Sequence, residues 1–307
     1  MAFLSSISTY SPSFAASQWK RSTVLSRSQE FFAPIVAILF FLIDRFFPNY
    51  SGLLSVTFLA IGFVFPGMAH GSLDYYLLVR SANGKLRNSV VLLYYIGIIG
   101  LILGAWFFSP LIVLLVFLLN SAYHFGETDL HHSALKGNVL RLTYGALLIL
   151  FFFFSHPSET AEYLRPFGIE FPVLSRFTML LICTGIGAIV TLFFVFAERS
   201  RQLINALLVL GIGTQLPLLL AFGIYYILVH SATAWNDLKH GLQLSASTMI
   251  KTAAPFTLAG IVFIVAAYAL FQRIEPFQGQ PVPLMIMGLA AITLPHTISM
   301  SVFYRRK

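Results

Sequence analysis

Residues 120–129 read NSAYHFGETD and directly follow an apolar run at 111–119. Polar side chains here occupy the end of a segment that would otherwise cross a membrane, where they are costly and usually mark a functional site. A second stretch, GMAHGSLD at residues 67–74, repeats the order of residue types. In each, a histidine (His124 or His70) precedes a glycine and then an aspartate, four or five residues on. The two stretches predict a polar site inside the membrane.

The composition indicates the fold class. Of the 307 residues, 58% are hydrophobic and 10% are charged, and the mean hydropathy is +0.83. Soluble domains carry about 25% charged residues, so we expect an all-α, polytopic integral membrane bundle. The apolar runs are continuous rather than alternating, which argues against a membrane β-barrel. The net charge of +8 lies in loops and at both ends and gives no support for a nucleic-acid partner.

The apolar runs predict about nine or ten transmembrane helices in a single domain, 31–307. Residues 1–30 are Ser-rich and lack the apolar core of a cleavable signal, so they predict a cytoplasmic tail. The helix count depends on the stretch 203–235, whose 33 residues exceed the ~20 of one crossing. GIGTQLP at 211–217 interrupts this stretch, which is compatible with one kinked helix or with two helices. Gly97, Gly100 and Gly104 predict close helix packing in the span 90–108.

Positive charge predicts the orientation in the cell (inner or plasma) membrane. The tail and the loops near 85, 136 and 200 carry Lys and Arg, which places the N-terminus in the cytoplasm. The C-terminal sequence RRK at 305–307 is also expected in the cytoplasm, so the number of crossings should be even. Two helices within 203–235 give ten crossings.

Ten crossings would bring four histidines to one depth. His70, His124, His230 and His296 would lie about 10, 5, 7 and 9 residues before cytoplasmic ends, or roughly 8–15 Å below one surface. A single crossing at 203–235 would instead leave His230 and His296 near the opposite face. Imidazole is a common ligand for iron, zinc and copper. The shared depth therefore favours a metal site.

Two aspartates are candidate partners for these histidines. Asp74 and Asp129 follow His70 and His124 by about one helical turn. Carboxylates often accept the second N–H of a ligand imidazole and orient the ring. We therefore expect the two carboxylates to accept hydrogen bonds from the ligand imidazoles and to orient them.

Four motifs resemble the bacteriorhodopsin-related Brp/Blh family of integral-membrane β-carotene 15,15′-dioxygenases. They are HGxxD at 70–74, HFGxxD at 124–129, YxxxHS at 226–231 and LPH at 294–296. The resemblance extends in matching order from about residue 30 to the end. It implies an Fe(II) enzyme that cleaves the central 15,15′ double bond of β-carotene with dioxygen, giving two retinals. It also implies His70, His124 and His230 as iron ligands.

The chain departs from the family pattern at one position. The family motif continues HSxxH, whereas Ala234 stands at the last position here, and alanine cannot bind iron. His296 or His240 could supply a fourth ligand, three histidines could hold the iron alone, or catalysis could be lost. His240 lies ten residues beyond His230, toward the outside of the bilayer. Among the substitutes we therefore prefer His296.

Two other classes of function stay open. A non-catalytic carotenoid- or retinal-binding helper of a membrane opsin is favoured by Ala234. A transporter or proton-relay protein is favoured by the interruption at 211–217 and by Asp and His inside the membrane. In the enzyme reading, substrate arrives through membrane lipid and retinal could pass to an opsin. Some of the 31 Phe residues could line an apolar channel, although most should face lipid.

Overall fold

The computed structural model describes residues 32–81, 88–133, 135–172, 174–196, 200–271, 273, 278 and 281–305. The predicted tail, 1–30, lies outside the described residues. So do several of the positive residues that carried the orientation argument, namely Lys85, Arg87, Arg199, Arg306 and Lys307. The cytoplasmic placement of the N-terminus therefore stays a prediction.

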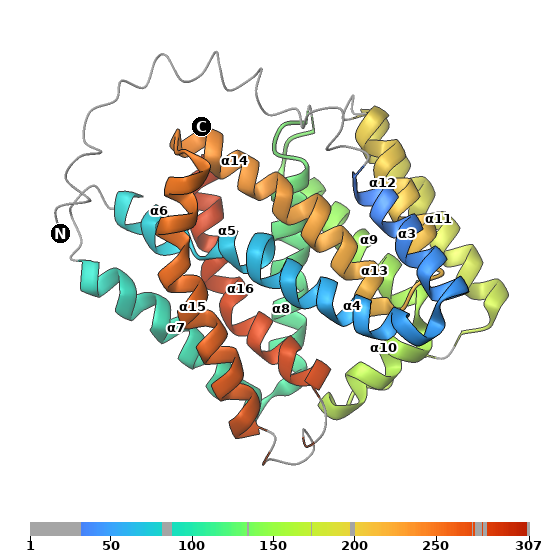
Figure 1. The fold of residues 1–307 in the computed structure, drawn as a ribbon, viewed down its shortest axis with the longest axis horizontal. Helices are drawn as coiled ribbons and strands as arrows, with labels where there is room; N and C mark the ends of the chain where they lie inside the picture. Colours follow the sequence, from blue (N-terminus) through green and yellow to red (C-terminus); the bar gives the residue numbers. More distant parts are fainter. Residues whose placement is uncertain are drawn as a thin grey trace.

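Every regular element in the described residues is helical, as predicted (Figure 1). The elements are α3 (Phe32–Phe46), α4 (Pro48–Gly62), the π-helix η2 (Phe63–Met68), α5 (Ala69–Gly71), α6 (Asp74–Ser81), α7 (Asn88–Phe108), α8 (Pro110–Asp129), α9 (Asn138–Ser155), α10 (Pro157–Leu164), the 3₁₀ helix η3 (Arg165–Phe167), α11 (Arg176–Phe196), α12 (Ser200–Gly213), α13 (Leu218–Tyr225), the π-helix η4 (Tyr226–Ser231), α14 (Ala232–Leu242), α15 (Ala246–Phe271) and α16 (Pro281–Arg305).

Eight helices in the described residues are long and apolar enough to cross a membrane. Two of them are composite: Pro48–Arg80 joins α4 to α6, and Leu218–Leu242 joins α13, η4 and α14. The remaining two predicted spans correspond to α3 and α12, which have 15 and 14 residues. The polytopic helical architecture is confirmed, while ten crossings stay a prediction.

The stretch 203–235 forms two helices. Helix α12 ends at Gly213, and α13 begins at Leu218 after a turn. Pro217 is the N-cap of α13, with φ −56° and ψ 143°. Proline fixes φ near this value and has no N–H to donate, so it is suited to the start of a helix and unsuited to its interior. This division is the one that the even number of crossings required.

Helices α8 and α9 pack with their backbones in contact. A Cβ added at Gly126 would lie 1.8 Å from the carbonyl oxygen of Arg141, and one at Gly145 would lie 1.8 Å from that of Ala122. Only glycine fits both positions, because any other residue would overlap a backbone atom. Small residues at such contacts are typical of membrane helices.

The close contacts predicted at the glycines of span 90–108 are not observed, although α7 packs against α16 and α8 through other residues. A Cβ added at Gly97, Gly100 or Gly104 of α7 would meet no described atom within 4 Å. A small-residue pattern permits close approach, but a neighbouring helix must also lie against the face that carries the small residues. In the described residues, such a contact between small residues and a facing helix is found between α8 and α9, at Gly126 and Gly145.

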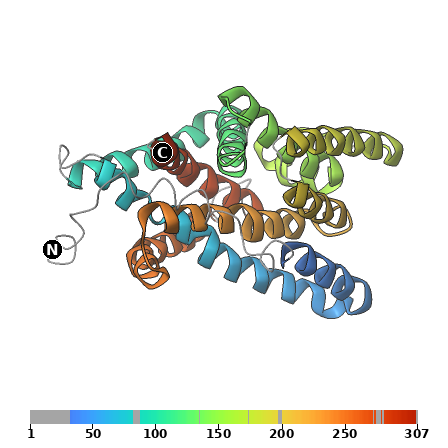
Figure 2. The same ribbon diagram turned by 90° about the horizontal axis from the view of Figure 1, so that it is seen from above.

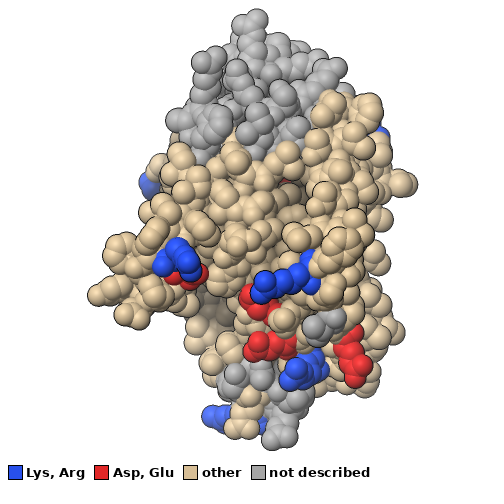
Figure 3. Space-filling model, turned by 90° about the vertical axis from the view of Figure 1, so that its right-hand side faces the viewer, with Lys and Arg blue, Asp and Glu red and all other residues tan. Residues whose placement is uncertain are grey.

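Helix α16 lies inside the bundle. Figures 1 and 2 show it (red) between the green α8 on one side and the orange α15 on the other. On the face in Figure 3, most of the Lys, Arg, Asp and Glu side chains lie in the lower half, and the described surface above them is largely uncharged. Such a surface suits contact with lipid. In the interior, α8 and α16 bury polar side chains, namely Ser121, His124, Glu127 and Thr128 of α8 and His296, Thr297 and Ser299 of α16.

Candidate metal centre

Four buried histidines from four separate segments meet in the interior. His70 comes from α5, His124 from α8, His230 from η4 and His296 from α16, and each is less than 10% exposed. Their ring centroids lie 4.7 Å apart for His124 and His296, 4.9 Å for His124 and His230, 4.9 Å for His70 and His296, and 6.1 Å for His70 and His230. The structure thus brings all four predicted histidines into one cluster, here called the histidine cluster.

The distances between ring nitrogens fit a shared metal ion. One ligand nitrogen each from His70, His124 and His296 lies within 4.8 Å of the other two. His230 is outside this group, yet its Nε2 lies 3.2 Å from Nε2 of His124. Two nitrogens bound about 2.1 Å from one metal are roughly 3.0–3.4 Å apart. Small ring movements would therefore allow joint coordination.

Two π-helices adjoin the cluster. Segment η2 runs directly into the α5 turn that carries His70, and η4 contains His230. The two segments touch, because a Cβ added at Gly67 of η2 would lie 3.0 Å from Cε1 of Tyr226 in η4. The Tyr226 ring stacks on that of His230, with centroids 6.0 Å apart and an interplanar angle of 20°. π-helical turns often occur at functional sites.

Each aspartate pairs with a histidine from a distant segment. Oδ1 of Asp74 lies 2.9 Å from Nδ1 of His296, and Oδ1 of Asp129 lies 3.3 Å from Nδ1 of His230. Asp74 and Asp129 therefore pair with histidines that are not their nearest ones in sequence. With Nδ1–H donated to a carboxylate, Nε2 presents its lone pair to a metal.

Nε2 of His296 has the environment expected of a ligand atom. It is buried and has no hydrogen-bond partner among the described residues. A buried polar nitrogen without a partner is costly, and a metal ion would remove that cost. The residues present therefore fit a metal held by imidazoles. The sequence offered His296 only as a substitute for the histidine missing at position 234. Its burial and its position in the histidine cluster make it a candidate ligand in its own right.

Tyrosines hold the two aspartates in turn. The Tyr95 hydroxyl donates to Oδ2 of Asp74 at 2.9 Å. Tyr225 donates to Oδ2 of Asp129, and the Tyr144 hydroxyl lies 3.5 Å from the same oxygen. Sequence reasoning missed these tyrosines, because they lie in apolar spans without a motif. The position of Tyr225 next to the YxxxHS motif was the one available signal.

The position at which the family motif has a histidine, residue 234, is part of an apolar core here. Ala234 is fully buried in a cluster that includes Leu73, Leu238 and Met300. The other substitute considered, His240, lies ten residues beyond His230 near the end of α14. Ten helical residues span about 15 Å. His296 is thus the substitute that the fold brings to the cluster.

Other polar residues of the opening stretch have structural partners. Glu127 is fully buried and accepts hydrogen bonds from Arg141 at 3.2 Å, Tyr123 at 3.1 Å and Ser301 at 2.5 Å. These bonds connect α8 with α9 and α16. The stretch 120–129 therefore contributes both to the histidine cluster and to the packing around it.

The histidine pair in the loop after α8 also has partners. Nε2 of His132 lies 2.8 Å from Oδ1 of Asp237, and the Tyr304 hydroxyl donates to Oδ2 of the same residue at 3.1 Å. The His131 ring lies on that of Tyr304, with centroids 4.1 Å apart. These contacts fasten the loop to α14 and α16.

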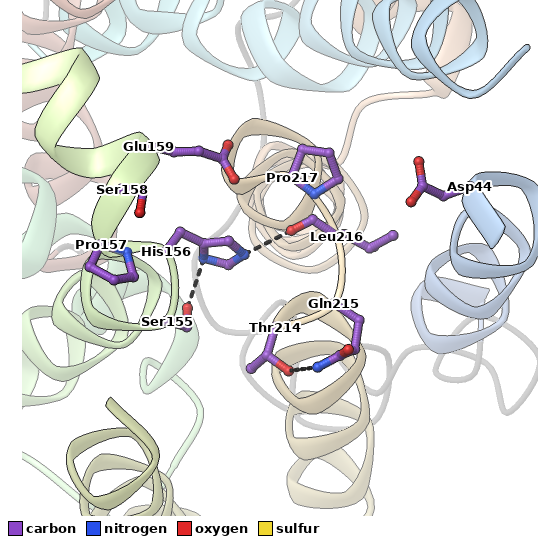
Figure 4. A pocket seen from close by; sticks show the side chains of 10 residues that line it. All are labelled: Asp44, Ser155, His156, Pro157, Ser158, Glu159, Thr214, Gln215, Leu216 and Pro217. Carbon is purple, nitrogen blue, oxygen red and sulfur yellow. Dashed lines mark hydrogen bonds between the residues drawn. The ribbon is translucent and has the colours of Figure 1, made fainter. Parts of the chain in front are cut away.

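A polar cavity of about 470 Å³ lies at the turn between α12 and α13 (Figure 4). Nε2 of His156 donates to the carbonyl oxygen of Leu216 at 2.8 Å, and Oε2 of Glu159 accepts from the backbone N–H of Leu218 at 2.8 Å. Asp44 faces the same cavity from α3 (Figure 4). His156 and Glu159 thus hold both sides of the helix break. The cavity shares no lining residue with the histidine cluster.

Two apolar cavities flank α16. The α9 cavity, about 130 Å³, lies between α8, α9, α10, α13 and α16, and the α15 cavity, about 330 Å³, lies between α4, η2, α7, α15 and α16. Tyr163 is one of the residues that line the α9 cavity. Its pKa is raised by burial and by the nearby carboxylates of Glu159 and Glu162. This hydroxyl is therefore neutral at physiological pH. Neither cavity is lined by a charged side chain.

Comparison with known proteins agrees with these observations. A family model described as Beta-carotene 15,15'-dioxygenase matches residues 61–304, a range that includes all four histidines and both aspartates. The chain is also similar to Beta-carotene 15,15'-dioxygenase of uncultured marine bacterium 66A03, with 23% identity over 278 residues that cover 83% of this chain and 96% of that protein. No solved structure matches. Since the family model covers most of the chain, this protein belongs to the Beta-carotene 15,15'-dioxygenase family.

Proposed function

We propose that this membrane protein cleaves the central 15,15′ double bond of β-carotene with dioxygen and releases two retinals. Each carbon of the broken bond becomes an aldehyde carbon, and each oxygen atom of one dioxygen enters one aldehyde. The reaction balances without another reductant. Family membership supports the reaction class and the substrate.

We further propose that His70, His124, His230 and His296 hold Fe(II). The observation that carries this proposal is the burial of four imidazoles in one cluster inside an apolar bundle. Non-haem iron with imidazole ligands and open positions supplies the activation of dioxygen. Four histidines from four segments would make ligation dependent on the complete fold.

The residues around the cluster have roles of their own in this proposal. Asp74 and Asp129 hold the Nδ1 protons of His296 and His230 and so fix which nitrogen faces the metal. The Phe125 ring, 4.4 Å from that of His230, covers one side of the cluster and excludes water. A dry site protects reactive species from side reactions.

The substrate would reach the site through the bilayer. β-Carotene is a hydrocarbon, and the α9 and α15 cavities are uncharged spaces beside the cluster. Binding sites for small apolar ligands are typically concave, apolar and largely preformed. A retinal-binding opsin is a reasonable acceptor for the product. We also propose that the N-terminus lies in the cytoplasm, as the positive residues of the tail and loops predict.

A direct assay tests the proposal. Purified protein loaded with Fe(II) should convert β-carotene to retinal, and with ¹⁸O-labelled dioxygen both aldehydes should carry the label. His124→Ala should abolish product, whereas His240→Ala, a change outside the cluster, should retain activity. A folded, iron-loaded wild type that makes no retinal would exclude the enzyme and leave a carotenoid- or retinal-binding helper, the reading that Ala234 supports.

A transporter has weaker support. In transporters, freed backbone carbonyls at a helix break typically coordinate ions. Here the carbonyl of Leu216 accepts a hydrogen bond from His156, and the N–H of Leu218 is bonded to Glu159. The polar groups at the break are therefore occupied by the side chains of His156, the N-cap of α10, and of Glu159, in the first turn of α10. Ion-dependent uptake by the purified protein in vesicles would support the transporter instead.

A further inference from the structure

One face of α16 leads directly to the histidine cluster. Met285, Leu289, Ile292 and His296 are spaced by four, three and four residues, so they share a face of the helix. Met285 and Leu289 line both apolar cavities, one on each side. From Met285 to His296 the face extends about 16 Å. This face therefore separates two cavities and ends at a candidate ligand.

The two cavities approach the cluster from different sides. The α9 cavity includes Phe125, the residue next to His124. The centroid of the Phe125 ring lies 4.4 Å from that of His230. The α15 cavity includes Met68, two residues before His70, and Ile292, one turn before His296. Each cavity thus ends beside a different pair of histidines.

Tyr226 connects the two cavities next to the cluster. Its ring lies 5.9 Å from that of Phe222, which lines the α9 cavity, and 6.2 Å from that of Phe63, which lines the α15 cavity. The same ring lies 6.0 Å from His230 and 6.4 Å from His70. An aromatic surface therefore runs from one cavity to the other beside the histidines.

We propose that the α9 cavity and the α15 cavity hold the two halves of one long apolar polyene, with its reacting double bond beside the histidine cluster and Tyr226. The proposal rests on the proposed cleavage and adds the placement of the substrate. Two arms in two cavities would centre the substrate on the metal, so a central bond would be the one cleaved. Met285 and Leu289 would keep the arms apart.

Substitutions that fill one cavity at a time test the proposal. Gly288 lines the α15 cavity, and an added Cβ there meets no described atom within 4 Å, so the side chain of Gly288→Leu can begin there without meeting the backbone and occupies cavity space. Leu219→Phe enlarges a side chain that lines the α9 cavity. Gly185→Leu on α11 is the matched control, because it also has open space and lines neither cavity.

The first measurement uses metal-free protein and all-trans retinal, which represents one half of the substrate. Quenching of protein fluorescence should give two bound retinals for the wild type and for Gly185→Leu. It should give one for Gly288→Leu, one for Leu219→Phe and none for the double variant. Two bound retinals in either single variant, with the protein folded, would overturn the proposal.

The second measurement uses iron-loaded protein and two substrates. Each single variant should lower kcat/KM for β-carotene on the order of ten-fold or more, because an overfilled cavity rejects a ring. A shortened apocarotenal with one ring should keep near wild-type cleavage, because its short arm can occupy the filled side. Equal losses for both substrates would overturn the two-arm placement. If the wild type cleaves neither substrate yet binds two retinals, the catalytic proposal fails and the two-arm site stands.

Discussion

Oδ1 of Asp74 lies 2.9 Å from Nδ1 of His296, although the two residues are 222 positions apart in the chain. Asp74 is itself four residues after His70. This pair therefore links the first histidine motif to the last, and the pair of Asp129 and His230 links the second motif to the third. The four motifs are thus joined in two pairs by hydrogen bonds, so the geometry of the site depends on all of them.

Removing either carboxylate should weaken metal binding without abolishing it. We expect Asp74→Asn and Asp129→Asn each to lower metal affinity or activity about 10–100-fold, because the imidazole would lose the partner that fixes its tautomer. Titration with Co(II), followed by its visible absorption, measures the affinity directly. Asp44→Asn, a change of an exposed carboxylate on α3, is the control. Unchanged affinity in both test variants would remove the orienting role.

Each histidine of the cluster should contribute to metal binding. His70→Ala, His124→Ala, His230→Ala and His296→Ala should all lower the iron content of purified protein. His296→Ala should be among these variants, because Nε2 of His296 is buried and has no hydrogen-bond partner in the described part of the chain. Metal analysis of folded variants decides the point. Full iron occupancy in the His296→Ala protein would reduce the site to the other three histidines.

Parts of this site were accessible from sequence and others were not. The histidines and aspartates stand out because charged or titratable groups in hydrocarbon are costly and need a reason. Their pairing could not be predicted, because it depends on how each helix is rotated about its axis. The π-helical segments change that rotation just before His70 and around His230. No spacing rule identifies Tyr95 as the partner of Asp74.

The same contrast applies to the fold. Hydropathy predicted the spans, because it depends on local chemistry. The interruption at 211–217 left one or two helices open, and the positive charges at the loops and ends favoured two. Helix contacts depend on which faces meet. Glycines on α7 and on α8 are equally visible in sequence, yet only Gly126 on α8 meets a neighbouring backbone. A small residue reports that close contact is permitted, and the fold decides whether it occurs.

The contact between α8 and α9 should be intolerant of a single methyl group. Gly126→Ala would place Cβ 1.8 Å from the carbonyl oxygen of Arg141, so the helices must separate. We expect a loss of at least 1–3 kcal/mol in the free energy of unfolding, measured by denaturant titration in detergent. Gly100→Ala on α7, where the added Cβ meets open space, should have little effect. Equal stability of the two variants would contradict the backbone contact.

The helix break should depend on its two side-chain partners. His156→Ala removes the donor to the carbonyl of Leu216, and Glu159→Gln weakens the acceptor for the N–H of Leu218. Leaving a buried polar group without a partner costs about 1–3 kcal/mol. Hydrogen exchange at 214–218 should accelerate in both variants. Retained protection there would show that the turn is held by packing alone.

The last prediction concerns Ala234, which stands where the family motif has histidine. Ala234 is fully buried against Leu73, Leu238 and Met300, so a larger side chain must displace its neighbours. Without metal, Ala234→His should therefore destabilise the protein, by roughly 1–3 kcal/mol for overpacking. A ligand that binds the folded state raises its stability in proportion to affinity and concentration. If the new imidazole reaches the metal, Fe(II) should raise the Tm of Ala234→His by more than that of the wild type.

Ala234→Leu is the matched control, because it overpacks the same position without a ligand atom. We expect the histidine variant to bind iron more tightly and to cleave β-carotene at least as fast as the wild type. The same Tm increase in all three proteins would place residue 234 outside the reach of the metal, with His296 as the ligand that completes the site.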